Sequence, residues 1–379
     1  MHRARVNEID LLRFIAALAV VFFHYAFRGH AADGLSAMPY PWLAPAAMYG
    51  YLGANLFFII SGFVILMTAE RGSLRGFVVS RVVRLYPAFW ACCSVTFLIV
   101  LAFGAPRFHA SLGQYAANMS MLNGFIGFAG FDWIDGAYWT LFVEMKFYLL
   151  VGAVLVLGRM RQVQGLLIGW LLLSMLGEAW PNKILRYFLI VDYSAYFMGG
   201  ATCFLVWSRG VSPARIGILA ASWALALVQS NKAVAAMAAH YGTDVSAWVA
   251  GGLITLSFGV MLLVALGLTG GFGRRRWLAV GALTYPLYLI HQNIGYIVFN
   301  HAYPALDAHL LLWGTLAVML GVAWLVHVLV ERRLAPPLKR GFERLLDGGA
   351  RLASPLRLRL SRQKGARTAA HDSKSPTPP

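Results

Sequence analysis

The sequence predicts an all-α polytopic membrane protein, a bundle of about ten transmembrane helices with both termini in the cytoplasm. Of its 379 residues, 59% are hydrophobic and only 12% are charged, and the mean hydropathy is +0.66. A soluble protein carries roughly twice that charged fraction. Apolar stretches recur along the chain, each long enough to cross a hydrocarbon core roughly 30 Å thick.

Ten apolar stretches can be placed in order along the chain. The stretches 163–179 and 216–230 are the shortest of them. The first is not a cleavable signal peptide, because Arg13 interrupts it and nine similar stretches follow. We expect spans near residues 10–28, 49–68, 85–104, 138–157, 163–179, 187–206, 216–230, 245–268, 277–299 and 309–330.

The net charge of +17 follows the predicted topology. With the N-terminus inside, the predicted cytoplasmic loops hold most of the arginines, and the opposite loops hold most of the acidic residues. This is the positive-inside asymmetry of membrane proteins, so the charge requires no nucleic-acid partner. We expect a membrane domain over residues 1–340 and a basic, disordered cytoplasmic tail over 341–379, which can lie on anionic membrane lipid.

The first span contains two ionisable residues, Arg13 and His24. Arg13 and His24 are eleven positions apart, which is close to three helical turns, so both side chains project from nearly the same face. Ionisable groups at membrane depth persist where they face a protein interior or a water-filled path, so each marks a candidate functional site.

The second and third spans begin with contrasting motifs. Gly53, Ser61 and Gly62 are small residues that let helices approach closely, so packing is their favoured role; Ser61 lacks the setting of a nucleophile. Arg81 and Arg84 precede the third span at a spacing that places both on one helix face. Guanidinium groups match phosphate oxygens in pairs, although the topology rule alone also explains these arginines.

The fourth and ninth spans carry the other candidate catalytic groups. Glu144 lies about two turns inside the fourth span, and Lys146 points to a different face, so the carboxylate needs another partner or a raised pKa. Pro286 in the ninth span can open a polar cavity near a second imidazole, His291. Asp192 and His327 are further intramembrane ionisable residues, for which a helix-packing role is equally favoured.

Five motifs in this order resemble the membrane-bound acyltransferase-3 family, whose members O-acylate bacterial surface polysaccharides, other glycosides and small molecules. The resemblance covers nearly the whole membrane domain. The motifs are Asp10-Leu-Leu-Arg13 followed by His24, Gly53 to Phe63, Arg81-Val-Val-Arg84-Leu-Tyr-Pro87, Trp139 to Tyr148, and Tyr288-Leu-Ile-His291-Gln292.

The resemblance implies an O-acyltransferase of the bacterial inner membrane. It makes His24 the general base, Arg13 its essential partner, and Arg81 with Arg84 an element that handles the acyl donor at the cytoplasmic face. The donor is then a cytoplasmic acyl-CoA, most simply acetyl-CoA, and the acceptor is a hydroxyl of an extracytoplasmic or lipid-linked carbohydrate. No metal is expected. Glu144 would orient or charge-balance an imidazole, and His291 would be a second base or an acceptor-site ligand.

Two alternatives remain compatible with the sequence. A proton-coupled transporter of a glycoside would also carry membrane histidines and carboxylates, although we find no clear internal repeat of the kind many transporters show. A non-catalytic partner in polysaccharide assembly would keep the fold without the chemistry.

Overall fold

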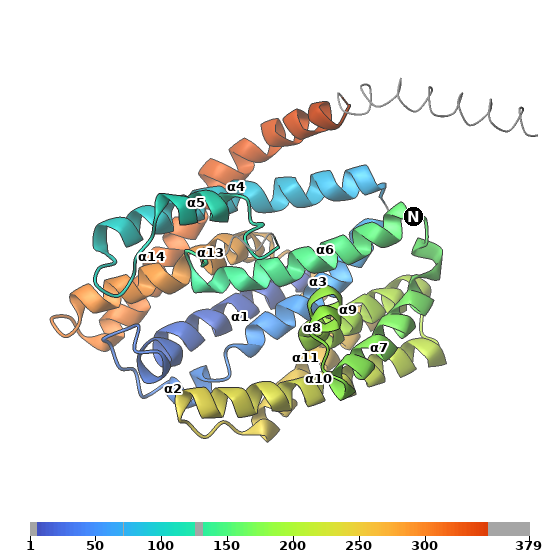
Figure 1. Ribbon diagram of the computed structural model, residues 1–379, viewed down its shortest axis with the longest axis horizontal. Coiled ribbons are helices and arrows are strands. Elements are labelled where there is room, and N and C mark those ends of the chain that lie inside the picture. Colours follow the sequence, from blue (N-terminus) through green and yellow to red (C-terminus); the bar gives the residue numbers. More distant parts are fainter. Residues whose placement is uncertain (1–5, 71, 126–131, 348–379) are drawn as a thin grey trace, which may run out of the picture.

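A computed structural model describes residues 6–70, 72–125 and 132–347, and all the regular structure within these ranges is helical. Two long helices, α1 (Glu8–Phe23) and α3 (Leu52–Glu70), run through the middle of the bundle (Figure 1). On one side of them lie α4 (Leu74–Phe103), α13 (Leu278–Ala302) and α14 (Ala308–Val326). On the other side lie α7 (Val163–Ala179), α9 (Val191–Arg209), α10 (Pro213–Tyr241) and α11 (Ala247–Leu266).

Shorter elements connect these helices. A π-helical segment, η1 (His24–Ala32), continues α1, and η4 (His327–Glu331) continues α14. The helix α6 (Trp139–Val156) crosses the face of the bundle seen in Figure 1. The remaining short helices are α2 (Ala44–Ala47), α5 (Leu112–Met119), η2 (Gly136–Tyr138), η3 (Met160–Gln162), α8 (Lys183–Leu189) and α12 (Gly271–Arg274).

Within the described ranges, nine helices are long and apolar enough to cross a membrane. They include both of the short stretches, which are the helices α7 and α10. The expected ninth span is the 25-residue helix α13, which is not among the nine. Every residue of α13 from Pro286 to Ile297 is buried, so its polar side chains face other helices. Nine of the ten expected spans are therefore helices long and apolar enough to cross a membrane, and α13 as a span stays a prediction.

Polar contacts gather the predicted cytoplasmic segments at one end of the bundle, which we call the basic end. There Arg209 at the end of α9 pairs with Glu70 at the end of α3 at 2.6 Å. Arg75 at the start of α4 pairs with Asp347 at 2.7 Å. At the opposite end, His240 contacts Asp33 at 2.9 Å. These contacts agree with the expected grouping of the loops, and the orientation of the two ends in the membrane stays a prediction.

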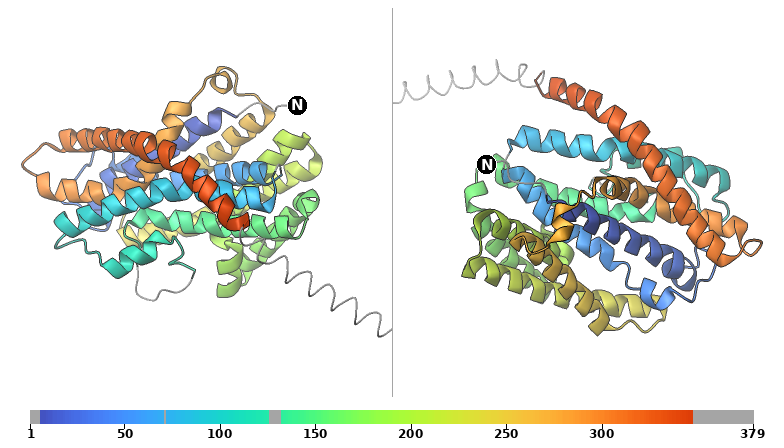
Figure 2. Two further views of the ribbon diagram at one scale, coloured as in Figure 1. Left: turned by 90° about the horizontal axis from the view of Figure 1, so that it is seen from above. Right: turned by 180° about the vertical axis from the view of Figure 1, so that it is seen from behind.

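The C-terminal part of the chain begins as a continuation of α14. The helix runs without a break from Ala308 to Asp347 and lies along the outer edge of the bundle beside α4 (Figures 1 and 2). It therefore extends seven residues past the predicted domain boundary at residue 340, through positions 341–347. The rest of the predicted tail, 348–379, lies outside the described residues.

Glycines let α3 pack closely against both of its neighbours. A Cβ at Gly53 would collide with the carbonyl oxygen of Ala16 on α1. On the other face, a Cβ at Gly62 would collide with the carbonyl oxygen of Phe197, and one at Gly200 of α9 with that of Ile59. Helix backbones in direct contact are typical of membrane bundles. The hydrophobic effect does not drive helices together inside lipid, so association depends on close van der Waals packing, which small residues allow. The packing role predicted for Gly53 and Gly62 is confirmed.

We expect Gly200→Ala to destabilise the protein, because its methyl group must push α3 away from α9. The cost of such overpacking is about 1–3 kcal/mol. The control is Gly217→Ala, since a Cβ at this helical glycine meets only open space. Thermal unfolding in detergent should show a lower Tm for Gly200→Ala and an unchanged or higher Tm for Gly217→Ala. Equal Tm values for the two variants would contradict the close contact of α3 and α9.

Candidate active site

The centre of the site is a pair of buried histidines, His24 and His291, at the contact between α1 and α13. Both side chains are almost inaccessible, with exposed fractions of 5% and 0%. Nε2 of His291 lies 3.1 Å from Nδ1 of His24, and the ring centroids are 5.0 Å apart. His24 is the first residue of the π-helical segment η1, a local widening of the helix that is frequent at functional sites.

Backbone carbonyls decide which nitrogens of this pair carry protons. Nδ1 of His291 lies 2.8 Å from the carbonyl oxygen of Tyr288, which only accepts, so this nitrogen donates. In the neutral ring Nε2 of His291 is then an acceptor, and it faces Nδ1 of His24. Nδ1 of His24 also lies 2.9 Å from the carbonyl oxygen of Val20, so it carries the proton. Nε2 of His24 therefore keeps its lone pair, and a general base accepts a proton through such a lone pair.

Toward the basic end, a cavity of about 80 Å³ lies among α1, α3, α4, α6 and α13. A single water needs roughly 10–15 Å³ by this measure, so the cavity has room for a few small groups and not for a sugar. It gathers two guanidinium groups and one carboxylate. The polar residues that line it include Arg13, Ser61, Arg84, Thr140, Glu144 and Tyr288.

Two hydroxyl groups hold the carboxylate of Glu144. The Ser61 hydroxyl donates to Oε1 at 2.8 Å, and the Tyr148 hydroxyl donates to the same oxygen at 2.7 Å. Lys146 points elsewhere, as expected, and its Nζ lies 3.5 Å from the ring centroid of Tyr187. Ser61, which the sequence indicated only as a packing residue, is thus also a partner of Glu144.

The two arginines that precede the third predicted span do not share one pocket. Arg84 lines the central cavity and also an open groove of about 460 Å³ between α4 and the C-terminal helix, together with Lys339 and Glu343. Arg81 lies over the ring of Tyr148, with its guanidinium carbon 5.7 Å from the centroid. Both arginines lie near Tyr148, but only Arg81 stacks on its ring, and the phosphate-binding role expected for the pair stays a prediction.

Tyr288 connects the cavity to the histidine pair. Its side chain lines the cavity, its hydroxyl lies 2.7 Å from the Thr140 hydroxyl, and its carbonyl oxygen accepts from His291. Thus Arg13, Arg84 and Glu144 share the cavity, whereas His24 and His291 lie beyond Tyr288. The sequence contained Tyr288 within the last motif, but nothing in its spacing indicated this connecting position.

Asp135 is a second residue whose position the sequence did not indicate. Its carboxylate is fully buried and accepts from the backbone amides of Ala137 at 2.9 Å and Asn293 at 3.0 Å. Burial raises the pKa of Asp135 to about 6, although these hydrogen bonds act to lower it. The carboxylate thereby fastens the loop before α6 to α13, two residues from His291.

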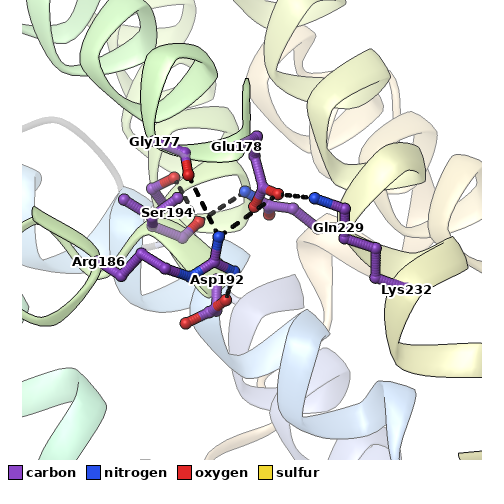
Figure 3. A network of polar contacts seen from close by, with 8 residues as sticks. Gly177, Glu178, Arg186, Asp192, Ser194, Gln229 and Lys232 are labelled. Atoms are coloured by element: carbon purple, nitrogen blue, oxygen red, sulfur yellow. Dashed lines mark hydrogen bonds and ion pairs between the residues drawn. The ribbon is translucent and has the colours of Figure 1, made fainter. Parts of the chain in front are cut away.

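The other ionisable residues at membrane depth belong to packing networks. Asp192 pairs with Arg186, which also reaches Glu178 at 3.7 Å, and Glu178 pairs with Lys232 (Figure 3). These contacts join α7, α8, α9 and α10. His327 lies 2.6 Å from Glu331, one turn further along its own helix. For both Asp192 and His327 the structure favours the packing role.

The fold and the site define a multi-span membrane protein with a buried imidazole pair next to a cavity lined by charged groups. Residues 6–328 match the model of the acyltransferase domain Acyl_transf_3, and the chain belongs to this family. It is 30% identical over 184 residues to nodulation protein 10 of Rhizobium leguminosarum bv. viciae. This match covers 43% of the present chain and 47% of the relative. The chain is 29% identical over 198 residues to the O-acetyl transferase of Shigella phage Sf6, covering 48% and 56%.

These matches span about half the length of the curated relatives. No solved structure matches the chain significantly. Among the described residues, no group of three or more His, Cys, Asp or Glu side chains is placed to hold a metal ion.

The hydrogen bond between His24 and His291 predicts different effects for two substitutions of His291. Gln can still offer a carbonyl oxygen to Nδ1–H of His24, whereas Leu cannot. We expect His291→Leu to lower the acyltransferase activity at least tenfold more than His291→Gln, because Leu leaves Nδ1–H of His24 with one orienting acceptor, the carbonyl oxygen of Val20, in place of two. Both variants should be compared at equal membrane abundance. Equal activity of the two would show that the hydrogen bond to His24 is not what His291 contributes.

Proposed function

We propose that this protein is an integral membrane O-acyltransferase of the bacterial inner membrane. It moves an acyl group, most simply acetyl, from cytoplasmic acyl-CoA to a hydroxyl of an extracytoplasmic or lipid-linked carbohydrate. One observation supports this proposal above the others. The free Nε2 of His24 belongs to an imidazole pair placed between a cavity that reaches the basic end and the opposite end of the bundle.

The donor enters from the basic end, which faces the cytoplasm in the predicted topology. Arg84 borders both the open groove and the central cavity, so its guanidinium is suited to hold a CoA phosphate at the entrance. Lys339 adds a second cation to the groove, which Glu331 and Glu343 also line. The cavity itself, about 80 Å³, matches the thioester end of acetyl-CoA better than that of a long acyl chain.

The carbohydrate approaches His24 from the opposite end. Its hydroxyl oxygen attacks the thioester carbonyl carbon, so a C–O bond forms and the C–S bond breaks. The hydroxyl proton moves to Nε2 of His24 and then to the departing sulfur, which leaves as the thiol of CoA. A positioned base of this kind contributes typically 10²–10⁴-fold to the rate.

The remaining residues support this step. Both ring nitrogens of His291 are engaged, by Tyr288 and by His24, so we assign it a positioning role in place of a second base or an acceptor ligand. Arg13 places a positive charge in the cavity, where charge develops on the thioester oxygen and sulfur. Glu144, held by two hydroxyl groups, balances this charge, and Arg81 supports Tyr148, one of its two donors.

His24→Gln tests the proposal. Gln keeps the polarity and rough size of the side chain but cannot take up a proton near neutral pH. We expect it to lower glycan O-acylation by at least 10²-fold while membrane insertion and acyl-CoA binding persist. The measurement is the acyl content of surface glycan in a deletion strain expressing each variant at equal abundance.

The matched control is His301→Gln. His301 is also a histidine near the outer end of α13, and its ring bonds only to the carbonyl oxygen of Ile297 among the described residues, at 2.9 Å. The His301→Gln variant should acylate like the wild type. Near-normal acylation by His24→Gln would contradict the role of His24 as the base. If the wild type acylated no more than the deletion strain, the proposed enzymatic function would be wrong.

A further inference from the structure

Tyr296 lies on α13 five residues beyond His291, about 7.5 Å further toward the opposite end. Its side chain has an exposed fraction of 0%. Its hydroxyl oxygen is buried and has no hydrogen-bond partner within residues 6–70, 72–125 and 132–347. A buried hydroxyl without a partner destabilises a protein, so each such group calls for an explanation.

The ring of Tyr296 stands beside the proposed base. Its centroid lies 6.3 Å from that of His24, at an interplanar angle of 61°. Arg28, one turn beyond His24, is near enough to interact electrostatically with both rings. The ring that carries the unpartnered hydroxyl therefore belongs to the immediate surroundings of His24, on the side away from the arginine-lined cavity.

Neighbouring residues hold this ring in place. Phe108 stacks on it at a centroid distance of 6.2 Å and an angle of 19°. On the other side, a Cβ at Gly29 would lie 2.5 Å from Cε1 of Tyr296, so only glycine leaves room for the ring. Because the side chain cannot move aside easily, its hydroxyl is a fixed donor rather than a group that turns toward solvent.

The polar residues outside Tyr296 already have partners. Nε of Arg28 donates to Asp33 at 2.6 Å, and His240 contacts the other carboxylate oxygen at 2.9 Å. Burial acts to raise the pKa of Asp33, but the hydrogen bonds from His240 and Arg28 outweigh this effect and lower it. Asp33 is thus held as a charged partner of Arg28, and the Tyr296 hydroxyl is a donor beside them without a partner among the described residues.

We propose that Tyr296 binds the acceptor: its hydroxyl donates a hydrogen bond to a sugar oxygen next to the reacting hydroxyl and so directs that hydroxyl onto Nε2 of His24. This inference rests on the function proposed above and adds a binding residue for the carbohydrate. The acceptor is then a sugar with an oxygen neighbouring the acylated position, and it is bound from the side of the histidine pair opposite to the donor cavity.

Tyr296→Phe tests this role, because it removes the hydroxyl and keeps the ring. In membrane vesicles that contain the endogenous polysaccharide and are supplied with acetyl-CoA, O-acetyl transfer should fall roughly tenfold, the effect of losing one hydrogen bond. The Tm of the purified variant should equal or exceed that of the wild type, since an unsatisfied hydroxyl has been removed. The thermal shift caused by acetyl-CoA should be unchanged, since the donor site lies elsewhere.

Tyr51→Phe is the matched control. Tyr51 also has a buried hydroxyl oxygen, but this hydroxyl lies near Ser230, and the residue lies just before α3, against Phe23 rather than His24. It should transfer acetyl like the wild type. Transfer by Tyr296→Phe within twofold of the wild type would overturn the inference, as would a loss accompanied by a lower Tm or a lost acetyl-CoA shift. Absence of transfer in the wild type and in Tyr51→Phe would instead reject the proposed function.

Discussion

The contact between His24 and His291 is the interaction on which the rest of the site depends. It joins the end of α1 to the middle of α13, and its geometry leaves only one nitrogen of the four, Nε2 of His24, with an unused lone pair. Two imidazoles at 3.1 Å cannot both be charged without strong repulsion, so the pair is suited to share a single proton. A capacity for one proton is sufficient for a base that takes up the hydroxyl proton and then returns it.

Membrane burial explains why so many polar groups around the pair are arranged by backbone carbonyls. Without water, each donor requires a partner inside the protein. The carbonyl oxygens of Val20 and Tyr288 meet this need for the two rings, and the Tyr25 hydroxyl donates to the carbonyl oxygen of His291 at 2.8 Å. The same requirement makes the unpartnered hydroxyl of Tyr296 conspicuous, because its partner is then most simply the substrate.

Close helix packing holds these groups in register. The glycines of α3 and α9 bring backbones into contact on one side of the site, and α13 packs against α1 and α4 on the other. Asp135 ties the loop before α6 to α13 close to His291, and thereby fixes the start of the helix that carries Glu144. Tyr288 lies at the boundary between the donor cavity and the histidine pair.

Much of the fold could be predicted from the sequence, since runs of about 20 apolar residues have few alternatives to transmembrane helices. The depth of His24, Glu144 and His291 likewise marked them as candidates, because ionisable groups are costly there. Their partners could not be predicted. The spacing of Arg81 and Arg84 places both on one helix face, but it does not indicate that Arg81 contacts the ring of Tyr148 from another helix. Ser61 acquires its role only from its tertiary contact with Glu144, and the side chain of Tyr288 from its contact with Thr140 of α6 and from the cavity that it lines.

The central claim is that donor and acceptor reach His24 from opposite sides of the membrane. Sealed vesicles of known orientation, supplied with radiolabelled acetyl-CoA on the outside only, test it most directly. Inside-out vesicles expose the basic end to the donor, so they should accumulate O-acetylated carbohydrate in the lumen or on lumenal lipid, and right-side-out vesicles should not until they are permeabilised. Equal labelling by sealed vesicles of both orientations would contradict transfer across the histidine pair.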